Sequence, residues 1–156
     1  MGPLAPGTTV IYDEESEGQY HSVITHLATL LSDHLQCPAL AFLNHDDDIL
    51  QYWLFERGEL IDTYNSWPGC FEDTGSATPM GGNSEIVCKS FGLPGLSSDI
   101  QQILHHGDFV FEFQRHLALA KSLNMNEDLA ILGFVDFQTE RLPEETEEIK
   151  HKFIRI

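Results

Sequence analysis

The fold follows from residues 38–66, PALAFLNHDDDILQYWLFERGELIDTYNS. Three short apolar and aromatic runs are separated here by the acidic His45–Asp48 segment and by Arg57-Gly58. Runs of β-favouring residues between turn residues are typical of antiparallel hairpins. The stretch therefore predicts a three-strand meander over 39–64. We expect its first two strands to be central, because they are apolar on both faces, and its third to lie nearer an edge.

Helical patterns flank the meander. Ser16 and Gln19 form a capping-box pair, and apolar residues at helical spacing follow them, which predicts a helix from Ser16 to Cys37-Pro38. Three further helices are predicted from polar caps and from Gly or Asn terminators. They cover 84–91, 98–106 and 108–124.

Two more apolar runs predict strands, near 8–12 and at 130–137. The expected fold class is therefore α+β, with a mainly antiparallel sheet made of the meander and these two strands, and with helices packed on it. We expect a single globular domain over 1–139, followed by a charged C-terminal tail at 140–156.

The net charge of −17 is unevenly distributed. Residues 1–140 hold 21 acids and four bases, whereas the last sixteen residues hold four of each. Binding to phosphate backbones and to anionic membranes requires clustered Lys and Arg, so this composition disfavours nucleic-acid and membrane partners. Two interpretations stay open: the acidic surface binds basic partners, or it only keeps the protein in solution.

The three cysteines, Cys37, Cys70 and Cys88, are widely spaced and match neither a disulfide framework nor a CxxC zinc pattern. The N-terminus shows no signal-peptide pattern. No apolar stretch approaches the ~20 residues that a membrane-spanning helix needs. We therefore predict a reduced, cytoplasmic setting.

The acidic segment is the first candidate site. Closely spaced carboxylates suit hard cations such as calcium or magnesium, so His45, Asp46 and Asp48 are candidate ligands of a divalent cation. Asp and Asn are also ordinary hairpin-turn residues, which leaves a solvated turn as the other interpretation. A bound cation here would favour a metal-dependent hydrolase.

The second candidate site is the segment that follows the meander. Residues 67–83 form a long Gly-, Pro- and Ser-rich stretch, and loops of this length are usually functional or disordered. Trp67, Cys70 and Phe71 at its start are candidate residues for binding a ligand or partner. No motif ties a histidine to Cys70, and Arg115 and His116 are expected to be exposed or partly buried rather than catalytic.

Asp73-Thr74-Gly75-Ser76 resembles the catalytic signature of aspartic proteases, and Ile131-Leu132-Gly133 resembles the motif that braces that loop in the retroviral type. The resemblance implies a dimer in which Asp73 of each chain activates water. That family is nearly all β between the two motifs, whereas residues 84–123 carry helical patterns here.

Taken together, the sequence favours a small, acidic, non-catalytic binding or regulatory module. Its expected partner is another protein, a second copy of itself or a small ligand, and no cofactor is expected apart from the candidate divalent cation. The alternative is a metal-dependent hydrolase that uses the acidic turn.

Overall fold

A computed structural model describes residues 2–5, 7–70 and 78–138. Its main sheet is antiparallel in the order β3 (Ala39–His45), β4 (Ile49–Glu56), β5 (Glu59–Asn65) and β6 (Met80–Gly81). The meander predicted over 39–64 is confirmed, and β6 extends it as a fourth strand. A separate two-stranded sheet joins β1 (Gly2–Ala5) to β2 (Thr8–Val10), so the strand predicted near 8–12 exists but does not join the main sheet.

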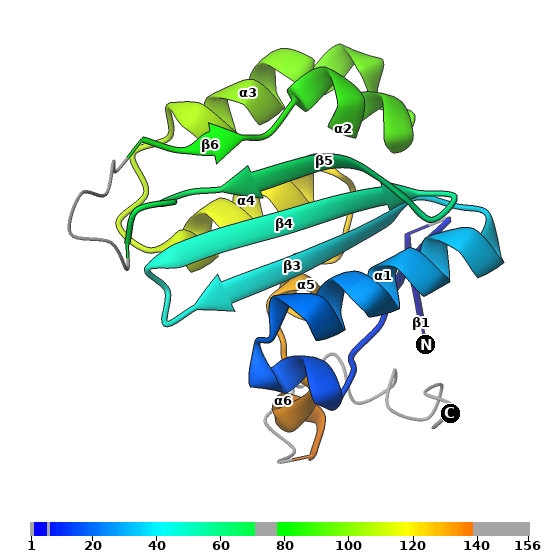
Figure 1. Ribbon diagram of the computed structural model, residues 1–156. Helices are drawn as coiled ribbons and strands as arrows, with labels where there is room; N and C mark the ends of the chain where they lie inside the picture. The colour runs from blue at the N-terminus through cyan, green and yellow to red at the C-terminus, as the bar shows by residue number, and fades with distance from the viewer. Residues whose placement is uncertain (1, 6, 71–77, 139–156) are drawn as a thin grey trace.

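Helices cover both faces of the main sheet, which confirms the α+β class. Helix α1 (His21–Leu35) lies on one face, where His21 contacts the ring of Trp53 at 5.1 Å. The other face carries α2 (Ser84–Ser90), α3 (Ser97–His105) and α4 (Glu112–Ser122). Figure 1 shows α1 and α4 on opposite sides of β3 and β4, with α2 and α3 beside β5 and β6.

The core lies between the sheet and α2–α4. Alternate residues of β4 point to this face, and Leu50, Tyr52 and Leu54 are all completely buried. Tyr52 stacks on Tyr64 of β5 at 5.5 Å. Burying a large apolar side chain contributes about 1.5–3 kcal/mol, so this cluster holds the helical layer on the sheet. No helix in the described residues is both long and apolar enough to cross a membrane.

The turn between β4 and β5 offers a test of local turn chemistry. Arg57 and Gly58 both have positive φ, 54° and 78°, which is the requirement of a type I′ hairpin turn. Glycine adopts this conformation freely, whereas arginine is strained in it and asparagine is not. We expect Arg57→Asn to raise the free energy of unfolding by about 0.5–1 kcal/mol, measured by urea denaturation.

The matched control for this turn is Gly58→Ala. Its new Cβ would lie 3.3 Å from the Cβ of Asp33, at a φ that alanine avoids. The Gly58 N–H also donates to Ser32 Oγ at 2.9 Å, which ties the turn to α1. The alanine variant should therefore be less stable than the native chain. Equal stability of all three chains would contradict the assignment of this turn.

The strand predicted at 130–137 is wrong. This region forms α5 (Glu127–Ala130) and α6 (Phe134–Gln138). The Asn126 side chain accepts a hydrogen bond from Leu129 N at 3.1 Å, and Asp136 Oδ2 accepts one from Gly133 N at 2.8 Å. A short apolar run does not by itself distinguish a strand from a helix, and these local side-chain caps favour helical turns.

The expected positions of β3 and β5 are also corrected. β3 is an edge strand, and β5 lies between β4 and β6. β3 nevertheless has an apolar pattern on both faces because α1 covers one face and α4 the other. On the α4 face, Phe42 packs against His116 at 4.3 Å, and on the other face β3 contacts α1. An apolar pattern on both faces of a strand therefore shows that helices cover both faces, and it does not show that the strand is central in the sheet.

Two helix starts and one helix cap differ from the prediction. Ser16 lies in a 3₁₀ turn, η1 (Glu15–Gly18), where its N–H donates to Asp13 Oδ2 at 2.9 Å. Helix α1 begins only at His21, because Gln19 takes a left-handed φ of 54°. Helix α2 starts as predicted but is capped by Asn83. Helix α4 begins at Glu112 rather than at Asp108. The predicted tail at 140–156 lies outside the described residues.

Candidate functional site

The acidic turn between β3 and β4 is a tight hairpin turn. Asp46 and Asp47 both have positive φ, 51° and 62°, and Asp48 N–H donates to the His45 carbonyl at 3.0 Å. This is again the geometry of a type I′ turn. Asn44 Nδ2 donates to Asp47 Oδ1 at 3.0 Å, and the three aspartates are exposed. The turn therefore presents concentrated negative charge to solvent.

The start of the second candidate site lies beside this turn. Ser66 N–H donates to the Leu50 carbonyl and Leu50 N–H donates to Ser66 Oγ, both at 2.9 Å. Because Leu50 follows the acidic turn by two residues, Trp67 emerges at the same end of the sheet, with 39% of its surface exposed. Cys70 is half-buried and has a free thiol, and its backbone N–H donates to the Trp67 carbonyl at 3.1 Å. Phe71 lies outside the described residues.

Two further segments bring apolar side chains to this end. Glu112 N–H donates to the Asp47 carbonyl at 2.8 Å, which places Val110 and Phe111 next to the turn. Val110 is 79% exposed and Phe111 49%, and Phe111 stacks on Phe113. Met80, 65% exposed, pairs with Asn65 at the end of β5. Figure 1 shows these segments at the left end of the sheet.

We call this area the sheet-end surface. It consists of four exposed apolar side chains and the three aspartates of the turn: Trp67, Met80, Val110, Phe111, Asp46, Asp47 and Asp48. The structure thus brings the acidic turn together with Trp67 of the second candidate site. Met80, Val110 and Phe111 were missed, because an exposed apolar residue has the same sequence pattern as one that folds back into the core.

The predicted cation ligands do not surround a common point. His45 Nδ1 hydrogen-bonds to Gln19 Oε1 at 2.6 Å, and its Nε2 lies 3.7 Å from a carboxylate oxygen of Asp46, whose side chain is 83% exposed. In the described part of the chain, no three His, Cys, Asp or Glu side chains are placed to hold a metal ion. A cation at the turn, and a hydrolase that would use it, both stay predictions.

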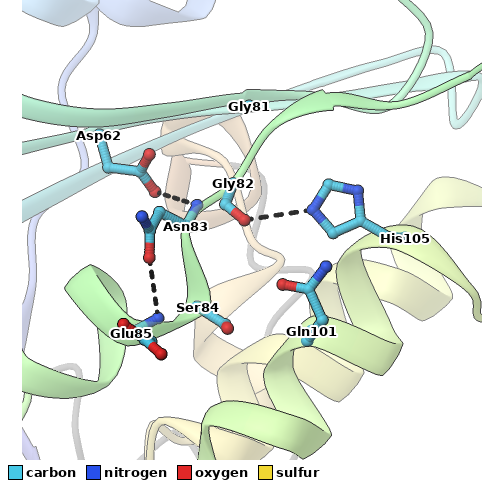
Figure 2. A pocket seen from close by; sticks show the side chains of 8 residues that line it. All are labelled: Asp62, Gly81, Gly82, Asn83, Ser84, Glu85, Gln101 and His105. Atoms are coloured by element: carbon cyan, nitrogen blue, oxygen red, sulfur yellow. Dashed lines mark hydrogen bonds between the residues drawn. The ribbon is translucent and has the colours of Figure 1, made fainter.

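A polar cavity of about 440 Å³ opens between β5, β6, α2 and α3. Figure 2 shows Asp62 and His105 on its two sides, with the Gly81–Asn83 turn between them. Asp62 Oδ2 accepts hydrogen bonds from Tyr52 OH at 2.7 Å and from Asn83 N–H at 2.9 Å. His105 Nε2 donates to the Gly82 carbonyl at 3.1 Å. A Cβ on Gly81 would collide with the Thr63 carbonyl oxygen, so this tight turn requires glycine.

These contacts assign a structural role to the polar cavity. Burial, and then the hydrogen bond to Asp62, raise the pKa of Tyr52 far above its ordinary value, so it stays a neutral donor that orients the carboxylate. Ser84 Oγ contacts Ser97 Oγ at 3.0 Å, and no described hydrogen bond joins it to His105. Nucleophilic catalysis needs a hydroxyl within reach of a base, and no described hydrogen bond joins Ser84 to a base in this cavity.

A second cavity, of about 460 Å³, lies on the α1 side of the sheet beside the acidic turn. Its lining includes the apolar side chains of Leu43 and Ile49 and the rings of Tyr20, His21 and His45. Gln19 spans this region, since its Nε2 donates to the Asn44 carbonyl at 3.3 Å. The cavity is lined by Gln19, Tyr20 and His21, at the left-handed break between η1 and α1 that the predicted uninterrupted helix did not include.

Arg115 and His116 are buried, not exposed, with 7% and 5% of their surface accessible. Arg115 Nε donates to Glu112 Oε2 at 2.9 Å, and its Nη1 donates to the carbonyls of Ile103 and Leu104 at the end of α3. These contacts fasten α4 to α3 and hold the segment that carries Val110 and Phe111. No local sequence pattern marks this role, because it depends on helix packing.

The resemblance to aspartic proteases has no support in the fold. Asp73 lies outside the described residues. Ile131-Leu132-Gly133 connects α5 to α6 and is not in a strand, so it does not occupy the bracing position that the family requires. Comparison of the chain with protein-family models, with curated proteins and with solved structures found no match.

Proposed function

We propose that this protein is a non-catalytic binding module that docks a basic, apolar-bearing segment of another protein on the sheet-end surface. The observation that carries the proposal is the exposure of four large apolar side chains, from three separate segments, around an acidic turn. Clustered exposed apolar residues rimmed by charge are typical of protein–protein interaction sites.

Charge defines the partner. The exposed Asp46–Asp48 carboxylates border the apolar side chains, and the whole chain carries a net charge of −17. A basic partner would be attracted over long range, whereas an acidic one would be repelled. Trp67 and Phe111 would supply the contact area, since aromatic residues dominate binding energy at such surfaces.

The experiment is selection of a random peptide library on the immobilised full chain. We expect enrichment of peptides that combine Lys or Arg with large apolar residues. The double variant Trp67→Ser/Phe111→Ser should weaken binding of the selected peptides about thirtyfold or more, because the loss of even one central aromatic contact costs about 2 kcal/mol. Binding should also weaken as salt rises.

A matched control uses exposed apolar residues away from this surface. Leu30 and Leu35 on α1 are 42% and 53% exposed, so Leu30→Ser/Leu35→Ser removes a similar area. The selected peptides should bind this control like the native chain. Peptides without basic residues, or equal loss of binding in both double variants, would refute the proposal.

A further inference from the structure

The second cavity, beside the acidic turn on the α1 side of the sheet, contains an exposed aromatic ring held in a fixed position. Tyr20 lines this cavity and is 69% exposed, so most of its surface is available to a ligand. Its carbonyl accepts hydrogen bonds from the N–H groups of Val23 and Ile24 at the start of α1, at 3.0 and 3.1 Å. A Cβ on Gly18 would lie 2.9 Å from two carbons of the Tyr20 ring, so the ring lies close to the backbone there. The cavity thus presents a preformed aromatic surface.

Negative charge borders the same cavity. Glu17 lines it, and Glu17 Oε1 accepts a hydrogen bond from Phe134 N–H, which holds the carboxylate in place. His45 also lines the cavity, and a carboxylate oxygen of Asp46 lies 3.7 Å from its Nε2. No Lys or Arg is among the described residues of the lining. A cation is therefore attracted to this cavity, and an anion is repelled.

An arginine side chain matches this combination of groups. Its planar guanidinium stacks on aromatic faces and binds carboxylates through parallel N–H donors. Its stem packs on apolar surface, which Leu43 and Ile49 supply here. The ammonium group of lysine is a strongly hydrated point charge and lacks the planar face. The cavity volume of about 460 Å³ lies within the roughly 300–1,000 Å³ range of ligand pockets.

The second cavity also adjoins the sheet-end surface, and only the acidic turn separates them. On one side of the turn, the Asp47 carbonyl accepts from Glu112 N–H, next to Phe111. On the other side, His45 Nδ1 hydrogen-bonds to Gln19 Oε1, and both residues line the cavity. A basic segment that crosses the turn reaches both areas. We propose that the second cavity binds the side chain of an arginine in the docked segment, an assignment that rests on the proposed function for the source of the arginine.

Titration of the full chain with N-acetyl-arginine methylamide, followed by NMR amide shifts, tests the cavity without the selected peptides. We expect saturable shifts at the amides of Gly18, His21 and His45. The lysine analogue should bind about threefold or more weakly, because it lacks the planar guanidinium. The variant Glu17→Gln/Tyr20→Ser should weaken binding of the arginine probe about tenfold, because it removes an ion pair and a cation–π contact. Glutamine at position 17 keeps an acceptor for Phe134 N–H.

Two single variants are the matched controls. Tyr20→Phe keeps the aromatic ring, and Glu15→Gln removes an exposed charge outside the cavity lining. Both should bind the arginine probe like the native chain. Shifts that do not saturate, equal affinity for the arginine and lysine probes, or unchanged binding in Glu17→Gln/Tyr20→Ser would overturn the arginine site.

Failure of the proposed function has a different signature. Peptide selection would then yield no basic sequences, while the arginine probe would still bind the cavity. That result would confirm the cavity as an arginine site and refute the docked segment as its source. Conversely, selected peptides that bind Glu17→Gln/Tyr20→Ser as tightly as the native chain would overturn the arginine assignment and leave the proposed function intact.

Discussion

Replacing Arg115 with methionine is expected to lower the free energy of unfolding by about 3–5 kcal/mol, because it leaves a buried charge without its partner. The side chain of Glu112 is only 13% exposed, and its carboxylate accepts from Arg115 Nε at 2.9 Å. The variant also removes the donor to the last carbonyls of α3 and the stacking of the guanidinium on Phe109 at 4.8 Å. Urea denaturation measures the loss.

Two further variants separate the causes of this effect. Arg115→Met/Glu112→Gln removes both charges and should recover part of the loss, since the uncompensated carboxylate is gone. Lys121→Met on the same helix breaks an ion pair in which the lysine is 73% exposed, and should change stability by less than about 0.5 kcal/mol. A loss below about 1 kcal/mol for Arg115→Met would contradict the buried role given to this residue.

His116 is expected to make the protein markedly less stable in acid. Burial lowers its pKa from the ordinary value of 6.5 to about 4. Between these two values the unfolded chain binds the proton and the native chain does not. The free energy of unfolding is therefore unaffected by His116 above pH 6.5 and decreases as the pH drops toward 4. Each pH unit in this window is worth about 1.4 kcal/mol, which gives a loss of about 3 kcal/mol.

The variant His116→Phe removes this titration and keeps a ring against Phe42, so the stability difference between variant and native chain should grow by about 3 kcal/mol from pH 7 to pH 4. Urea denaturation at several pH values measures it. His116→Leu provides a second non-titrating chain if phenylalanine packs poorly. The exposed His26 gives the control, since His26→Gln should follow the native pH profile. Parallel profiles for His116→Phe and the native chain would refute a neutral buried His116.

Features specified by neighbouring residues could be predicted from the sequence. The meander, its two turns and the positions of α2 and α3 follow from β-favouring runs, caps and glycines that act within a few residues. The acidic turn was recognised for the same reason. The run at 130–137 shows the limit: its apolar residues fit a strand or a helix, and contacts such as Tyr12 OH to the Leu129 carbonyl come from the far end of the chain.

The sequence by itself determined the α+β class, the acidic charge and two of the segments that form the proposed binding surface. Only the tertiary structure decided that these segments meet, that Met80, Val110 and Phe111 join them, that β3 is an edge strand, and that Arg115 and His116 are buried. The physical reason is the range of the interactions. Turns and caps are local, whereas strand order, burial and the convergence of side chains depend on pairing between residues distant in the chain.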